Sequence, residues 1–328
     1  MPDLEINGYR YVTLKDNDPF DYNPAKKKVV PSSQVIPKMG TSSSMNEIET
    51  DENYYRYTRN KIVTRLQSPI ELFYQVSDHL DLSKKRFVTS VLMDMAVKSA
   101  PSFFDRFNNT FENKKIGLFA SQKEDGGAIL SDERISDKFV DFFDFVCMQI
   151  QEDVLLVSNI DGTPRVSLCH SFAPNGWGAN TVINKSFEEL HSEVVFSDGK
   201  LVFPSGNKLA VKLTKSFCKL ERIGAIGFYT NPILNRHPAL RPPDEYNIFN
   251  PNKPELYLKF ERQTITGLPE IDSFLFIVKN YVIDVFAPDK YIQNLNMLEN
   301  IDKNAYYRNW LQLNVENVKN ELKKRITQ

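Results

Sequence analysis

Two long apolar segments, Leu256–Phe260 and Phe274–Ile283, lie on either side of a polar tetrapeptide, Glu261–Thr264. Both segments have the aromatic and branched composition of strands, and Gly267–Pro269 between them is typical of a turn. Charged and hydrogen-bonding side chains are costly to bury without partners. The sequence therefore predicts a pair of adjacent strands in which Arg262 holds a group of opposite charge.

Residues from about 47 to 105 have the periodicity of helices. Ser68–Glu71 fits a capping box with proline at the first helical position. It predicts a helix with Leu72, Val76 and Leu80 on one face. A second apolar stripe, ending near Pro101, contains Phe87, Val91 and Met95, and a third predicted helix contains Phe139, Phe142, Phe143, Val146 and Ile150.

Beyond these helices the periodicity becomes that of strands. Val154–Ile160 and Arg165–Phe172 are separated by Asp161-Gly162, a hairpin turn signal. The other predicted strands are Leu201–Phe203, Lys208–Leu213, Ala225–Thr230, Leu256–Thr266 and Phe274–Val285. Residues 231–254 are predicted to form a long loop, and helices resume at about Asp289. Helices, then an antiparallel sheet, then helices indicate the α+β class.

The chain of 328 residues is predicted to contain one domain, residues 46–328, preceded by an arm at residues 1–45. Gly40–Ser44 resembles a flexible linker, so part of the arm is predicted to be mobile. With 23 Phe and 14 Tyr, the composition is sufficient for a sizeable core.

Charge and cysteine usage exclude several classes of protein. Lys plus Arg number 41 against 42 for Asp plus Glu, so the charge balance does not favour nucleic acid as a partner. No apolar stretch reaches the roughly 20 residues of a membrane span, and the N-terminus lacks the pattern of a signal peptide. Cys147, Cys169 and Cys218 are too few and too scattered for a disulfide framework or an iron–sulfur cluster. We therefore expect a cytoplasmic protein.

Histidine is scarce, which limits the chemistry further. His79, His170, His191 and His237 are the four histidines, and none forms a His-x-x-x-His pair. Heme needs only one axial imidazole, an apolar slot and cations for its propionates. His191 ends a short predicted helix, where capping or packing is the ordinary role of a histidine. On the pattern alone, His170 would be a half-buried strand residue and Arg262 an ion-paired one.

Four blocks in order resemble the heme-dependent oxidative N-demethylases, specifically their heme-binding subunit. They are Ile150–Leu156 with its Gln-Glu-Asp, Phe172–Trp177, His191–Val194, and Glu261–Thr264 followed by Leu268-Pro269 and the strand Phe274–Tyr281. The Arg-Gln-Thr element with Leu-Pro and the strand is the most specific of the four. The resemblance covers roughly residues 45 to 325.

This resemblance implies a PAS-like antiparallel sheet flanked by N-terminal and C-terminal helices and holding heme b. It implies oxidation of an N-methyl group of a small amine such as dimethylamine with O2, releasing formaldehyde. Electrons would come from NADPH through separate flavin and iron–sulfur proteins, that is, reductase and ferredoxin-type partners. The chain itself contains no site for either of those cofactors.

The resemblance also implies roles for individual residues. His191 is expected to be the axial iron ligand, with His170 as its rival, and Arg262 is expected to pair with a propionate. The remaining expected cofactor-binding residues are Trp177, Gln263 and Thr264. Candidates for the proton source are Glu152, Asp153 and Tyr229.

The chain departs from the family pattern at four places. Val195 replaces a proline, Val182 and Asn184 stand where a Lys and a Gly are usual, and Gly227–Asn231 replaces an Arg-x-Asn-Trp element. These departures bear on the identity of the substrate rather than on heme binding. Two alternatives to an enzyme are a heme-binding sensor or carrier without turnover, and a heme-free interaction protein.

Overall fold

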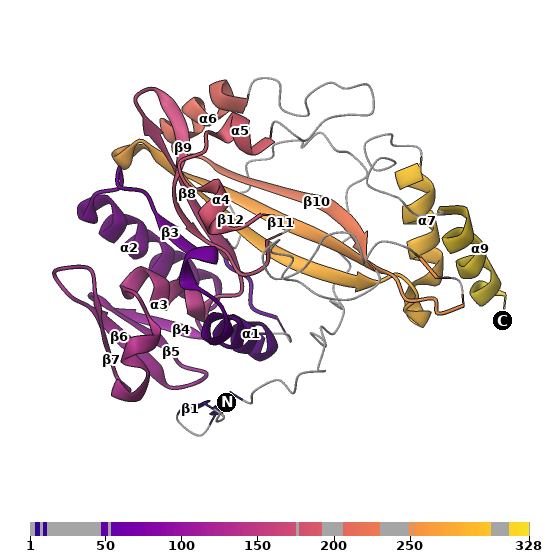
Figure 1. The fold of residues 1–328 in the computed structure, drawn as a ribbon, viewed down its shortest axis with the longest axis horizontal. Coiled ribbons are helices and arrows are strands. Elements are labelled where there is room, and N and C mark those ends of the chain that lie inside the picture. The colour runs from indigo at the N-terminus through magenta and orange to yellow at the C-terminus, as the bar shows by residue number, and fades with distance from the viewer. Residues whose placement is uncertain are drawn as a thin grey trace.

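The structure of the protein is a computed structural model that describes part of the chain. These are residues 4–6, 9–11, 47–51, 54–174, 177–191, 206–229, 249–250, 252–302 and 315–327. Within them, one large antiparallel sheet runs through the centre of the molecule, with helices on both of its faces (Figure 1).

The large sheet has six strands, and each strand is antiparallel to its neighbours. In spatial order they are β10 (Lys219–Tyr229), β11 (Tyr257–Leu268), β12 (Ser273–Asp284), β8 (Asp153–Ile160), β9 (Thr163–His170) and β3 (Tyr74–Val76). The middle and last thirds of the chain are joined at the centre of the sheet, because β12 pairs with β8, with Ile277 opposite Val154.

Helices α1 (Tyr54–Gln67), α2 (Leu82–Ser99) and α3 (Phe142–Gln149) cover one face of this sheet, and α4 (Ala179–Val182), α5 (Phe187–His191) and α6 (Gly206–Thr214) cover the other. Two C-terminal helices, α7 (Tyr291–Asp302) and α9 (Val315–Ile326), pack on each other beyond the far end of β11 and β12 (Figure 1). Short 3-10 turns lie at Ile70–Leu72, Glu133–Lys138, Pro269–Ile271 and Pro288–Lys290.

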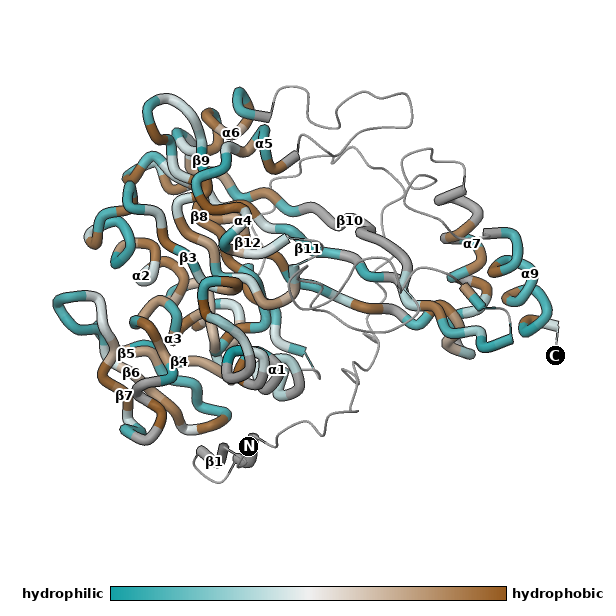
Figure 2. The backbone as a smooth tube through the Cα atoms, in the orientation of Figure 1, coloured by the Kyte–Doolittle hydropathy of each residue, from teal (hydrophilic) through white to brown (hydrophobic). Residues whose placement is uncertain are grey.

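A second, four-stranded sheet packs against α2 and α3. Its strands are β4 (Phe104–Phe107), β5 (Thr110–Asn113), β6 (Leu118–Gln122) and β7 (Ala128–Leu130). Phe104 and Phe111 from this sheet share a core with Phe142 of α3 and Leu275 of the large sheet. Hydrophobic stretches gather where β8, β9 and α3 lie, whereas α9 is largely hydrophilic (Figure 2). A small hairpin, β1 (Leu4–Ile6) with β2 (Tyr9–Tyr11), lies near the N-terminus.

The α+β class is confirmed, and several elements form where the sequence predicts them. β8 and β9 form a hairpin whose turn residues, Asp161 and Gly162, have φ of 50° and 81°, the left-handed region that this turn requires. The side chain of Asp81 caps α2 by accepting from the Lys84 amide (2.8 Å). Asp141 likewise caps α3, so that helix begins at Phe142 rather than at residue 139.

Two predicted elements are wrong. The capping box at Ser68–Glu71 does not start a helix: a 3-10 turn forms at residues 70–72, and Tyr74–Val76 becomes strand β3 because it pairs with β9. Lys208–Leu213 is not a strand but part of helix α6, whose Ala210 and Leu213 pack on the large sheet. A short apolar segment is compatible with both the helical and the strand periodicity. In these two segments the tertiary packing determines which conformation forms.

Other predictions lie outside the described residues. They are the strand Leu201–Phe203, most of the loop at 231–254, most of the arm at residues 1–45, and Val195. Asn184, where the family usually has Gly, has φ of 63°, a backbone conformation that glycine and asparagine tolerate best. That substitution is therefore compatible with the local backbone.

Candidate functional site

Successive residues of β11 and β12 alternate between the two faces of the large sheet. Leu275 and Ile277 pack in the core with α2 and α3, whereas Phe274 and Phe276 pack with α4, α5 and α6. We call these the α1–α3 face and the α4–α6 face. The register of the sheet assigns the predicted site residues on its strands to one face or the other.

Arg262 lies on the α1–α3 face and is 11% exposed. Its Nε donates to Glu221 Oε1 (2.5 Å), and its Nη1 lies 3.9 Å from Glu49 Oε2. Burial opposes the charge of Arg262, but the hydrogen bond and charge of Glu221 outweigh burial, so the pKa of Arg262 is raised. The partners described for Arg262 are thus carboxylates of the chain itself, and propionate binding stays a prediction.

Residues 47–51 form a strap that lies along the α1–α3 face. The amide of Glu49 donates to Glu152 Oε1 (2.6 Å), and the hydroxyl of Tyr281 donates to the Glu49 carboxylate. Lys279 donates to the Glu49 carbonyl (3.1 Å). The strap is therefore fixed to the sheet because it accepts hydrogen bonds from β12 and donates one to Glu152, which precedes β8.

Two buried lysines lie beneath the strap. Lys61 donates to the carbonyls of Cys147 (3.0 Å) and Glu152 (2.9 Å), and Lys279 lies 3.4 Å from Asp51 Oδ2. Burial lowers the pKa of both lysines and raises the pKa of Glu152. The pKa shifts of these three groups arise because burial in the packed interior removes water from their charges.

His170 lies on the α1–α3 side as well, and it is fully buried. Its Nε2 is 3.0 Å from Asp144 Oδ1, and Asp144 also accepts two hydrogen bonds from Arg65 (2.8 Å each). The rings of Tyr74 and Phe172 lie 5.6 and 5.3 Å from the imidazole. Nδ1 of His170 has no partner. Burial lowers the pKa of His170, although the hydrogen bond to Asp144 opposes this shift.

The α4–α6 face receives other members of the predicted set. Asp153 accepts from Ser171 Oγ (2.8 Å) and from the amides of Phe172 (2.8 Å) and Ala173 (3.1 Å). Lys259 donates to the Ala173 carbonyl (2.7 Å). Both side chains thus hold the segment that follows β9 against this face. Asp153 thus accepts hydrogen bonds from three consecutive residues, Ser171, Phe172 and Ala173, which is the pattern of a structural carboxylate.

Gln263, Trp177 and Tyr229 also belong to this face. Gln263 donates to Glu261 Oε2 (2.9 Å), and half-buried Trp177 packs with the α4–α6 core. Tyr229 is half-buried and lies opposite Tyr257 at the end of β10.

Helix α5 brings His191 to the same side of the sheet. Phe187 at the start of α5 packs edge-to-face on Phe274 of β12, with ring centroids 6.0 Å apart. His191 is the last residue of this helix, as predicted from the sequence, and its side chain is outside the described part of the structure.

Among the described residues of the α4–α6 face, Asn280 is a candidate that sequence reasoning missed. It lies within β12, is 0% exposed, and neither its Oδ1 nor its Nδ2 has a hydrogen-bond partner. An unsatisfied buried polar group costs about 1–3 kcal/mol. In the sequence, Asn280 is simply one residue of the predicted strand that contains Phe274–Tyr281. Only the tertiary structure shows that its amide has no hydrogen-bond partner.

Thr264 has a similar orphaned group on the opposite face. It is 1% exposed, and its Oγ1 has no partner. Among the four residues of the Glu261–Thr264 tetrapeptide, therefore, Glu261 and Gln263 lie on the α4–α6 face, and Arg262 and Thr264 lie on the α1–α3 face.

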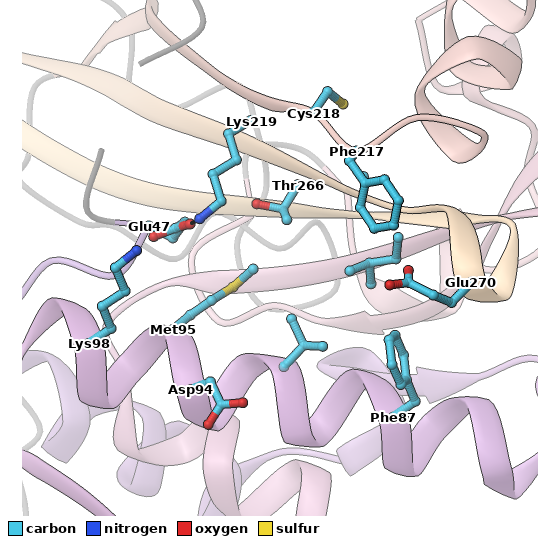
Figure 3. Close-up of a pocket in the computed structure, with 13 residues that line it drawn as sticks. Glu47, Phe87, Asp94, Met95, Lys98, Phe217, Cys218, Lys219, Thr266 and Glu270 are labelled. Carbon is cyan, nitrogen blue, oxygen red and sulfur yellow. Dashed lines mark hydrogen bonds and ion pairs between the residues drawn. The ribbon is translucent and has the colours of Figure 1, made fainter. Parts of the chain in front are cut away.

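A pocket of about 480 Å³ opens between α2 and the ends of β10 and β11 (Figure 3). Phe87 and Met95 of α2 line one side, and Phe217, which is 80% exposed, lies on the other. The ion pair of Glu47 with Lys219 closes one end. The predicted cofactor-binding residues do not line this pocket.

Orphaned polar atoms lie on both faces of the large sheet, in different surroundings. The orphaned His170 Nδ1 lies within closely packed rings, whereas orphaned Asn280 lies on the face that carries α5 and Trp177. An apolar surface with a few polar groups is the usual lining of a cofactor site. Within the described ranges, no group of three or more His, Cys, Asp or Glu side chains could hold a metal ion by itself. Among the same residues, no helix has the length and apolarity to cross a membrane.

The fold and these buried polar groups define an α+β protein with a central antiparallel sheet and a candidate ligand face. The chain belongs to the family described as haem-dependent oxidative N-demethylase, alpha subunit-like, whose model matches residues 39–303. That match confirms the family resemblance drawn from the four sequence blocks. A search of curated proteins found no match.

Proposed function

We propose that this chain holds heme b against the α4–α6 face and is the heme-bearing subunit of a monooxygenase. Its substrate would be an N-methyl or related small amine, oxidised with O2 and releasing formaldehyde. The observation that carries this proposal is Asn280, a buried amide without a partner, on the face to which α5 brings His191. The heme dependence in the name of the family supports the same choice of cofactor.

A PAS-like fold is part of the proposal, and the order of the strands supports it. If β8, β9, β10, β11 and β12 are numbered one to five, their spatial order is 2-1-5-4-3. Helices α4, α5 and α6 connect the second strand to the third. PAS domains have this strand order and bind ligands between such helices and the sheet. The single-domain boundary at residue 46 remains a prediction.

His191 is proposed as the axial ligand, because a neutral imidazole at a helix end needs only an open side to bind iron. His170 is assigned a structural role, since its Nε2 is bonded to Asp144 and its ring is enclosed by Tyr74 and Phe172. Arg262 is assigned to holding the strap.

When bound, heme supplies the activation of O2, and the protein supplies the pocket around it. Asp153 and Lys259 hold residues 171–174 over the α4–α6 face, which would limit the access of water. Tyr229 is proposed to hold a proton at its phenolic oxygen, because it lies on this face. Glu152 lies on the other face, so its raised pKa is assigned to the strap network. Electrons are proposed to come from NADPH through separate flavin and iron–sulfur partners of a cytoplasmic complex.

An absorption spectrum of the purified chain, as isolated and after incubation with hemin, tests the proposal. We expect a Soret band that shifts on reduction with dithionite and that is altered in His191→Ala but retained in His170→Ala. No Soret band in either preparation would indicate a heme-free interaction protein. A Soret band without formaldehyde release, assayed with NADPH and a flavin and iron–sulfur electron-transfer system, would indicate a sensor or carrier.

A further inference from the structure

The pocket between α2 and the ends of β10 and β11 is lined by two buried residues that each have an orphaned polar atom. These atoms are Thr266 Oγ1 and Glu47 Oε2, and the two residues are 7% and 1% exposed. Thr266 lies opposite Leu275, which packs in the core with α2 and α3, so the pocket is on the α1–α3 face. An inference about this pocket therefore goes beyond the proposed function, which concerns the α4–α6 face.

Both orphaned atoms belong to one end of the pocket. The hydroxyl of Thr266 points toward the end at which Glu47 and Lys219 lie (Figure 3). The ion pair with Lys219 uses Oε1 of Glu47, which leaves Oε2 as a buried acceptor without a donor. Buried polar atoms without partners are destabilising, so a ligand that bonds to both atoms removes a cost of the ligand-free fold.

The charges at this end select a neutral ligand. Lys98 and Lys219 both extend toward Glu47, so a cation would meet two like charges (Figure 3). An anion would meet the buried carboxylate of Glu47. The other carboxylates of the lining, Asp94 and Glu270, are exposed to solvent. The group that fits is uncharged, with an N–H donor for Glu47 Oε2 and an acceptor for the Thr266 hydroxyl.

The rest of the pocket is apolar. Met95 of α2 and Leu268 of β11 line it, with 6% and 5% exposure. At the end away from Glu47, the rings of Phe87 and Phe217 lie on opposite sides (Figure 3). An apolar space of about 480 Å³ with a few polar groups has the character of a small-molecule site, and two facing rings favour a flat aromatic body.

We propose that this pocket binds a neutral primary carboxamide carried on a flat aromatic body. The NH2 group of the ligand donates to Glu47 Oε2, and its carbonyl oxygen accepts from Thr266 Oγ1. The aromatic body lies between Phe87 and Phe217. The site is separate from the proposed heme site, because the large sheet lies between them.

Equilibrium dialysis of the full-length chain against three probes of similar shape tests the head group. Naphthamide has the donor and the acceptor, acetonaphthone replaces the NH2 group with a methyl group, and naphthoate carries a negative charge, all at the same ring position. We expect naphthamide to bind at least about tenfold more tightly than either of the others. No binding of naphthamide, or equal binding of naphthamide and acetonaphthone, would overturn the inference.

Thr266→Val tests the position of the head group, and Thr264→Val is its matched control. Both threonines are buried on the same face with an orphaned hydroxyl, but only Thr266 lines the pocket. Neither variant should have a lower melting temperature than the native chain, because each loses a hydroxyl without a partner. Thr266→Val is expected to weaken naphthamide binding severalfold, and Thr264→Val to leave it unchanged. Equal effects of the two variants would overturn the assignment.

Phe217→Ala tests the position of the aromatic body without disturbing the core, since Phe217 is 80% exposed. Phe107→Ala is its control, because Phe107 is 77% exposed and does not line the pocket. Phe217→Ala should weaken naphthamide binding severalfold, whereas Phe107→Ala should not change it. Unchanged binding in Phe217→Ala would contradict the proposed site. The comparison of the three probes uses the native chain alone, so it remains decisive if a variant does not fold.

Discussion

Arg262 and Gln263 are adjacent on β11, yet their side chains serve opposite faces of the large sheet. Arg262 donates to Glu221 on the α1–α3 face, and Gln263 donates to Glu261 on the α4–α6 face. Because side chains alternate along a strand, a flat ligand on one face contacts only one of the two. The tetrapeptide Glu261–Thr264 belongs to the most specific of the four family blocks. It thus contains both Arg262, which forms a structural ion pair, and Gln263, which lies on the candidate ligand face.

Arg262→Gln is expected to lower the free energy of unfolding by about 1–3 kcal/mol, because it leaves partly buried carboxylates without their cation. The lower part of that range applies if water screens Glu221, whose side chain is 35% exposed. Urea unfolding measures the change. Lys253→Gln is the control: it removes a pair in which the lysine is 74% exposed, and it should change stability by less than about 0.5 kcal/mol. A variant with unchanged stability and no Soret band would instead support propionate binding by Arg262.

Thr264→Val is expected to raise the free energy of unfolding by about 0.5–1.5 kcal/mol, because it replaces a buried hydroxyl that has no partner with a methyl group of similar shape. Urea unfolding again gives the change, and the Soret band of the hemin-treated protein should be unaltered. Weaker heme binding in this variant would contradict the assignment of Thr264 to the α1–α3 face and would support its predicted role as a donor to the cofactor.

His170 should make stability depend on pH in a defined window. Burial lowers the pKa of His170 in the folded chain, so the unfolded chain takes up a proton at higher pH than the folded chain does. Above pH ~6.5 both states are neutral and the effect is absent. As the pH falls below this value, the native chain should lose stability relative to His170→Gln, by up to about 1.4 kcal/mol per pH unit.

Urea unfolding of both proteins between pH 5 and pH 8 tests this dependence. The pKa of Asp144 is lowered below its usual value near 3.8, by hydrogen bonds from His170 and Arg65 that outweigh burial, so Asp144 titrates outside that range. Parallel stability curves for the native chain and His170→Gln would show that the imidazole is not held neutral.

Gly267→Ala is expected to destabilise the fold by about 3 kcal/mol or more, since overpacking against backbone atoms cannot be relieved by a rotamer change. A Cβ at this position would meet the carbonyl oxygens of Ser216 and Leu213, the latter at 2.9 Å. Gly162→Ala is the control: a Cβ there meets nothing within 4 Å, and only its φ of 81° is unfavourable. Equal losses in urea unfolding for the two variants would contradict this close approach.

Local signals were enough to predict most of the large sheet, although β10 begins at Lys219 rather than at the predicted Ala225. The Asp161-Gly162 turn and the long apolar segments of β11 and β12 appear in the structure close to their predicted bounds. Tyr74–Val76 and α6 were misassigned, because each is short and takes its conformation from the strands on which it packs. The four-stranded sheet at residues 104–130 was missed entirely, since its strands are short and lack a regular apolar alternation.

The candidate site was predicted only in part, for a related reason. A motif names residues without saying which of them share a face, and the pairing of β10, β11 and β12 supplies that information. The roles of Glu152 and Asp153 looked alike in the sequence, yet one joins the strap and the other fixes residues 171–173. The orphaned amide of Asn280 is a property of its surroundings, which no local pattern encodes.

The strap also constrains the order in which the chain can assemble. The hydrogen bond between Tyr281 and Glu49 spans 232 residues, and β8 finds its partner β12 only after more than a hundred further residues have been made. Folding rate falls as contacts become more distant in sequence. During synthesis the open edge of β8 and the strap at Glu49 must wait for β12, so we expect slow, late closure of the sheet and dependence on chaperones until the C-terminal third has left the ribosome.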